Sequence, residues 1–143
     1  MGLYIYVVIA WAVALAVVDF REHRLPDRLT LPAYPVAFAF LAVAFPENIG
    51  VGATAAVALI TAGYIAHRWF DLGFGDVKLL GVAALIVAAT RNPADSLAEM
   101  LVVTALLGGI HAAIHLVITR DRRAHIPFGP AILVGVVVAA ISG

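Results

Sequence analysis

Residues 3–18 read LYIYVVIAWAVALAVV, sixteen apolar residues without a charge, and Asp19 follows them directly. The hydrocarbon core of a bilayer is about 30 Å thick, and a helix needs roughly 17–25 mainly apolar residues to cross it. Further uncharged runs cover 29–45, 49–66, 100–118 and about 130–142, and a run from Val77 to Thr90 is interrupted only by Lys78. Several runs are short, so we expect their polar ends to lie within the membrane boundary.

The runs show no alternation of apolar and polar residues, which a membrane β-barrel would need. Helices satisfy their own backbone hydrogen bonds in lipid and are the natural interpretation. We therefore predict an all-α, polytopic membrane protein with about six transmembrane helices in a single domain, 1–143. Four spans is the alternative count.

The composition excludes several classes of protein. The chain has 143 residues, of which 64% are hydrophobic and 13% charged, with a mean hydropathy of +1.04. Soluble domains have about 45–50% apolar and about 25% charged residues, so a water-soluble globule is excluded. The net charge is zero and no basic face appears, which excludes a nucleic-acid binder. The chain has no cysteine, which excludes disulfides, cysteine-ligated zinc and thiol catalysis.

The positive charges predict an orientation. Three connecting segments, near 19–28, 67–78 and 119–125, hold eight of the nine Lys and Arg residues, and Arg91 lies on the opposite side. Basic loops stay in the cytosol, so we expect both termini to lie outside it. The first run could instead be a cleaved signal peptide, but a signal peptide needs a basic region before its apolar stretch. Here the arginines follow that stretch, and we treat it as the first helix.

Six acidic residues fall on the predicted cytosolic side: Asp19, Glu22, Asp27, Asp71, Asp76 and Asp121. Most have basic neighbours; Asp71, for example, lies three residues after Arg68, a spacing that suits a helical ion pair. Asp19 and Asp76 stand out because both are expected at the same depth, at the ends of apolar runs. Ionisable groups at a membrane edge are functional candidates.

Two carboxyl groups brought within a few ångströms do not both ionise easily, and such a pair can hold a water molecule between an acid and a base. This arrangement can hydrolyse a peptide bond without a covalent intermediate. The structural alternatives are that Asp76 is the N-cap of its helix and that Asp19 marks the end of a span.

The sequence also allows predictions for two glycines, one lysine and two histidines. Gly73 and Gly75 can give the backbone conformations closed to other residues. Lys78 lies two residues beyond Asp76 and does not share its helix face, so we expect it to extend to the interface. His111 and His115 have a spacing that suits a metal, but no Cys or carboxylate nearby completes a site. We expect neutral histidines lining the bundle, with no metal and no cofactor.

Small residues repeat at helical spacing and predict close helix packing. Three sets show this spacing: Ala105, Gly109 and Ala113; Gly52 and Ala56; Gly81, Ala84 and Ala88. We interpret these positions as scaffold.

Three segments together resemble the type IV prepilin peptidases. In the segment from Asp19 to Asp27 an Asp precedes a Leu-Pro-Asp triplet by six residues, as at the first catalytic aspartate of that family, and Leu29 to Pro32 continues the likeness. Gly73-Phe74-Gly75-Asp76 is similar to the GxGD segment that carries the second aspartate. Ile126 to Ala131 resembles the motif before the last helix.

The resemblance implies a membrane-embedded aspartic endopeptidase of the bacterial inner membrane, with its active site facing the cytosol. It would remove the basic leader from a prepilin-like substrate with an apolar helix. Asp19 and Asp76 would be its catalytic acids. Lys78, with Gly73, Gly75, Pro127, Phe128, Gly129 and Pro130, would shape the active site and bind substrate.

The chain lacks the cysteine-paired insertion of bifunctional members and resembles short single-module members associated with Flp/Tad-type pili. N-methylation and the oligomeric state stay open. Two other functions are weighed against the peptidase. A small proton-coupled transporter would need His111 and His115, and a non-catalytic subunit of a pilus or secretion assembly would tolerate loss of both acids.

Overall fold

The computed structural model describes residues 2–22, 27–70, 72–119 and 128–143, and the regular secondary structure in those ranges is helical. In chain order the elements are α1 (Gly2–Glu22), α2 (Asp27–Thr30), α3 (Ala33–Ala44), the 3-10 turn η1 (Pro46–Asn48), α4 (Ile49–Phe70), α5 (Phe74–Ala88), α6 (Pro93–Thr119) and α7 (Gly129–Ser142). Each of the six predicted apolar runs overlaps one of the helices α1, α3, α4, α5, α6 and α7.

The run 29–45 is not one continuous helix. The single turn α2 ends at Thr30, residues 31 and 32 form a turn, and α3 begins at Ala33. Proline lacks a backbone N–H and cannot continue a helix ladder from within, and Pro32 lies at the N-cap of α3. The break places α2 beside α5.

The centre of the bundle is α5, which packs against α3, α4, α6 and α7. The residues from Gly81 to Thr90 are all buried. A helix that is apolar on every side is either enclosed by protein or exposed to lipid, and α5 is the enclosed one.

Two of the predicted small-residue sets lie in the core. Gly52 and Ala56 are buried on α4, and Gly81, Ala84 and Ala88 are buried on α5. A Cβ at Gly52 would come within 2.6 Å of Leu41 Cδ2 and 3.0 Å of Ala88 Cβ. The absence of a side chain there lets α3, α4 and α5 approach closely, as predicted.

The third set is wrongly assigned to the scaffold. Ala105, Gly109 and Ala113 are exposed on α6, and nothing lies within 4 Å of a Cβ built at Gly109. The buried glycine of α6 is Gly108, where a Cβ would collide with the ring of Phe128. Because α6 is apolar on all sides, its sequence does not show which face turns inward.

Large apolar side chains cover the outside of α4 and α6, including Val57, Ile65, Trp69, Leu106, Ile110, Ile114, Val117 and Ile118. By length and apolar composition, the stretches Pro46–Trp69 and Pro93–Ile118 could each cross a membrane, and Leu3–Asp19 and Gly129–Ser142 are shorter apolar helices. Soluble monomers rarely expose large contiguous apolar surfaces. The exposed faces of α4 and α6 are therefore compatible with contact to lipid.

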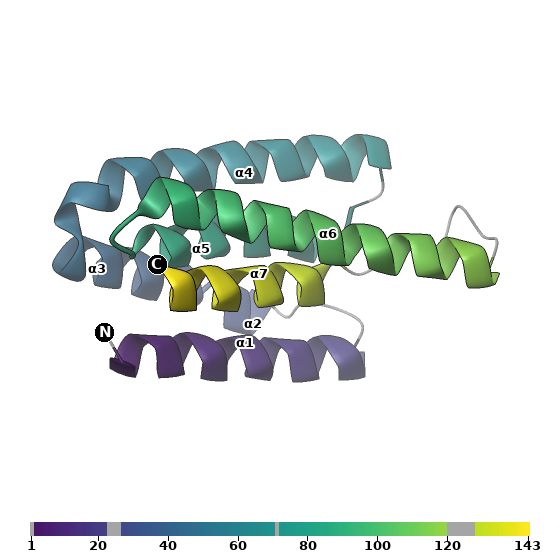
Figure 1. Cartoon of the computed structure of the whole chain (residues 1–143), viewed down its shortest axis with the longest axis horizontal. Helices are drawn as coiled ribbons and strands as arrows, with labels where there is room; N and C mark the ends of the chain where they lie inside the picture. Colours follow the sequence, from purple (N-terminus) through teal and green to yellow (C-terminus); the bar gives the residue numbers. More distant parts are fainter. Residues whose placement is uncertain (1, 23–26, 71, 120–127) are drawn as a thin grey trace.

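Figure 1 shows how the ends of the helices are distributed. The first turn of α1 and the last turn of α7 lie at one end of the bundle, with the connection from α3 to α4 and that from α5 to α6. The last turns of α1, α4 and α6 and the first turns of α5 and α7 lie at the opposite end. The segments that carry the two candidate aspartates thus share one end of the molecule.

Candidate functional site

Asp76 lies in the first turn of α5 and is 5% exposed. Its Oδ2 atom accepts a hydrogen bond of 3.3 Å from the backbone N–H of Phe128, immediately before α7. A buried carboxyl group needs such partners, because burying a polar group without them is costly. This contact joins two of the three motif segments across 52 positions of sequence.

Asp76 is not the N-cap of its helix. Gly73 occupies that position, and α5 begins at Phe74, so Asp76 is the third helical residue. No side chain caps this helix end; instead the backbone N–H groups of Asp76 and Val77 donate to the Gly73 carbonyl. The N-cap interpretation is wrong because α5 begins at Phe74, two residues before Asp76.

Asp19 lies one turn from the end of α1 and is half-buried. The helix continues through Asp19 to Glu22, and the apolar part of α1 ends at Asp19, so the alternative that Asp19 marks the end of a span stays open. Helix α7 packs against both α1 and α5, and the end of α1 and the start of α5 face the same end of the bundle (Figure 1). The sharing of one proton by Asp19 and Asp76 stays a prediction.

The glycines of the turn do not adopt unusual backbone conformations. Gly73 has φ −58° and ψ 133°, values open to any residue. Gly75 lies inside the first turn of α5. The expected special backbone geometry at Gly73 is therefore wrong.

Lys78 extends from α5 to α2. Its Nζ atom lies 2.6 Å from Oδ1 of Asp27, and it sits 4.9 Å from the centre of the Phe74 ring. The sequence predicted that Lys78 would extend to the interface but did not predict this ion pair. Both side chains are partly exposed, so the pair contributes little to stability, but it connects two of the motif segments.

Two residues that sequence reasoning missed hold this end of α5 in place. The Tyr34 hydroxyl, on α3, donates to the Lys78 carbonyl over 2.7 Å. His67 Nδ1, near the end of α4, donates to the Leu72 carbonyl over 2.6 Å, just before the turn, and its ring lies 5.6 Å from that of Phe74. These are long-range or loop contacts that no spacing in the sequence signals.

The remaining predicted residues divide as follows. Phe128 lies against Asp76, Gly129 is buried, and Pro130 occupies the first turn of α7, where proline is well tolerated. Pro127 and Asp71, with the predicted ion pair of Asp71, lie outside the described residues. His111 is exposed on α6, so the expectation that it lines the bundle is wrong, and His115 is half-buried. Within the described ranges no group of three His, Asp or Glu side chains is placed to hold a metal.

Comparison with known proteins places the chain in a family. The model of the type IV leader peptidase family matches residues 6–117. The chain belongs to the type IV leader peptidase family. It is also 30% identical, over 148 aligned residues, to the prepilin leader peptidase/N-methyltransferase of Escherichia coli strain K12. That alignment covers 94% of this chain and 60% of the relative, so the chain spans less than two thirds of the relative's length. No solved structure shows a significant match.

For a type IV leader peptidase, two of the three motif segments fall inside the family match. The segment from Asp19 to Pro32 and the GxGD segment lie within residues 6–117, whereas Ile126 to Ala131 lies beyond it. The resemblance seen in the sequence is thus confirmed at the level of the family. The hydrogen bond from Phe128 to Asp76 independently connects the third segment to the second.

Proposed function

We propose that this chain is a membrane aspartic endopeptidase that removes the basic leader from type IV prepilin-like substrates. The observation that carries the proposal is the buried carboxyl of Asp76, which accepts a hydrogen bond from Phe128 at the end of the bundle where α1 brings Asp19. Membership of the type IV leader peptidase family supports the same reaction.

In the proposed mechanism one aspartate accepts a proton from water as the water attacks the scissile carbonyl. The other protonates the departing amide nitrogen, so that both proton transfers occur within one pair. The roles are not divided between Asp19 and Asp76, because two interacting carboxyl groups titrate as a unit. A glycine before the cut would ease local unwinding of a helical substrate.

We place the reaction at the cytosolic face of the bacterial inner membrane. The basic segments near 19–28, 67–78 and 119–125 support this orientation through the positive-inside rule. The basic leader of a substrate would be retained in the cytosol by the same rule. The bond to be cut would then reach the membrane boundary at the depth of Asp19 and Asp76.

The test is co-expression with a candidate prepilin, with cleavage measured as a size shift on a gel. Asp19→Asn and Asp76→Asn each replace a carboxyl with an amide of the same size that cannot exchange the proton. We expect each change to lower the cleavage rate by about 10²-fold or more. The matched control is Asp95→Asn, since Asp95 is exposed in the first turn of α6, at the other end of the bundle.

Protein level and thermal unfolding, compared with the parent, show whether each variant still folds. Cleavage at the parental rate by folded Asp19→Asn and Asp76→Asn proteins would contradict the proposal and favour a non-catalytic assembly subunit. Proton-coupled flux that depends on His111 and His115 would favour the transporter.

A further inference from the structure

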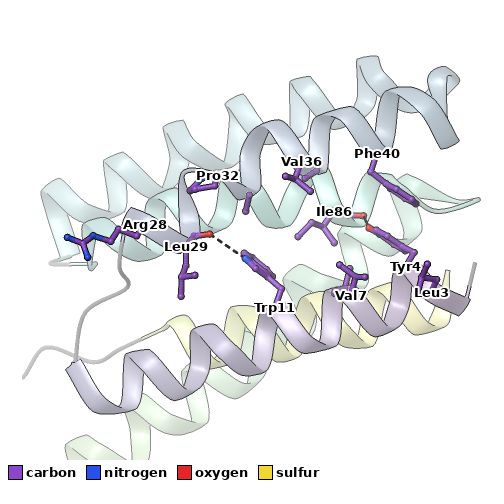
Figure 2. A pocket seen from close by; sticks show the side chains of 13 residues that line it. Leu3, Tyr4, Val7, Trp11, Arg28, Leu29, Pro32, Val36, Phe40 and Ile86 are labelled. Carbon is purple, nitrogen blue, oxygen red and sulfur yellow. Dashed lines mark hydrogen bonds between the residues drawn. The ribbon is translucent and has the colours of Figure 1, made fainter.

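A groove of about 570 Å³ separates α1 from α3, and Figure 2 shows its lining. Leu3, Tyr4 and Trp11 line it from α1, Val36 and Phe40 from α3, and Arg28 lies at the end away from Leu3. From Leu3 to Trp11 the groove follows α1 for about 12 Å, taking 1.5 Å per helical residue. It lies apart from the buried carboxyl of Asp76, which is not among its lining residues.

The polar atoms of Tyr4 and Trp11, which line the groove, form hydrogen bonds with backbone carbonyls. The Tyr4 hydroxyl donates to the Ile86 carbonyl, and Trp11 Nε1 donates to the Leu29 carbonyl over 3.4 Å. The Tyr4 ring stacks on Phe40 with centroids 4.2 Å apart. The walls therefore present hydrocarbon to any occupant.

One end of the groove carries a positive charge. Arg28 is exposed, and in Figure 2 its side chain points away from the apolar lining, toward the end of the bundle where α1 ends. The neighbouring acid, Asp27, is paired with Lys78. Within the part of the chain that the structure describes, Arg28 makes no ion pair. An apolar channel that ends at a guanidinium group is complementary to a hydrocarbon chain with an anionic head.

We propose that this groove binds one anionic phospholipid, with an acyl chain between α1 and α3 and the phosphate group on Arg28. Arginine binds phosphate through paired N–H donors. The acyl chain itself gains little free energy, because the surrounding lipid is as apolar as the groove. Selectivity for this lipid therefore comes from the charge at Arg28.

An apolar helix is the competing occupant, and the charge at one end of the groove disfavours it. A substrate helix preceded by a basic leader would place positive charge beside Arg28, and like charges repel.

Trp11 makes the proposal testable by fluorescence. The chain has two tryptophans, and Trp69 is 80% exposed on α4, so Trp69→Phe leaves Trp11 as the sole reporter in the groove. The protein is placed in bilayers that contain phosphatidylglycerol or phosphatidylcholine with identical brominated acyl chains, which quench nearby tryptophans. We expect brominated phosphatidylglycerol to quench Trp11 with a relative affinity at least about threefold higher than that of brominated phosphatidylcholine.

Two arginine variants, made in the Trp69→Phe protein, identify the source of the selectivity. Arg28→Gln should bring the affinity ratio to about one. Arg68→Gln is the matched control, because Arg68 is an exposed arginine near the end of α4, outside the groove lining, and should leave the ratio unchanged. The Trp11→Phe protein, which reports on Trp69, should show a ratio near one.

Three results would overturn the proposal. Equal quenching of Trp11 by both lipids would show that the site does not select an anion. If Arg28→Gln still prefers phosphatidylglycerol over phosphatidylcholine, a residue other than Arg28 recognises the lipid headgroup. If the site has equal affinity for both lipids and an added apolar helical peptide relieves the quenching of Trp11, the groove binds a helix. Each result is independent of whether the chain cleaves a prepilin.

Discussion

Gly81 lies where α3 and α4 both reach α5. A Cβ at this position would collide with the Tyr34 hydroxyl and come within 2.6 Å of Ile60 Cδ1. Since that hydroxyl also donates to the Lys78 carbonyl, displacing it would break a contact that holds the start of α5. We predict that Gly81→Ala lowers the free energy of unfolding by about 1–3 kcal/mol, as overpacking does, measured by thermal unfolding in detergent.

Gly109→Ala is the matched control, since it makes the same change in a neighbouring helix. A Cβ at Gly109 meets nothing within 4 Å. Replacing a helical glycine with alanine without strain stabilises by about 0.4–1 kcal/mol, so this variant should unfold at or above the parental temperature. Equal destabilisation by both variants would show that the contacts of Gly81 are not what matters.

At the residue scale the sequence pointed to Asp76 but not to its surroundings. The GxGD motif and the position of Asp76 beside an apolar run were enough to single out this residue. Its hydrogen bond from Phe128 and the Tyr34 contact on Lys78 join residues 52 and 44 positions apart. Such contacts depend on how helices dock, and no local pattern encodes them.

At the element scale, Asn48 fixes the far end of α5. It is 8% exposed, and its Nδ2 atom donates to the Ala88 carbonyl over 3.0 Å and to the Thr90 carbonyl over 2.8 Å. The last carbonyls of a helix have no partner within it, so Asn48 supplies donors that α5 lacks. We predict that Asn48→Ala costs about 1–3 kcal/mol of stability, measured by thermal unfolding.

The control for Asn48→Ala is Thr54→Ala. The Thr54 hydroxyl is exposed and donates to the Gly50 and Val51 carbonyls of its own helix, so its loss should change the unfolding temperature little. If Asn48→Ala unfolds at the parental temperature, the end of α5 does not depend on η1.

The helices themselves were predictable because a long apolar run in this composition has few other structures available. Which of the helices are buried and which are exposed could not be predicted. Helix α5 contains Lys78 within its apolar run, yet it is the enclosed helix, whereas α4 and α6 are mostly exposed. The Ala105–Gly109–Ala113 face was misassigned for the same reason. Periodicity reports a buried face only when the opposite face is polar.

At the scale of the whole molecule, the orientation predicted from charge can be tested with single cysteines, because the chain has none of its own. Glu47 and Arg68 are both exposed and lie at opposite ends of the bundle, with α4 between them. In intact cells, a maleimide that cannot cross the inner membrane should label Glu47→Cys but label Arg68→Cys only after the cells are permeabilised. The reverse pattern would contradict the cytosolic placement of Asp19 and Asp76, and labelling of both in intact cells would show that α4 does not cross the membrane.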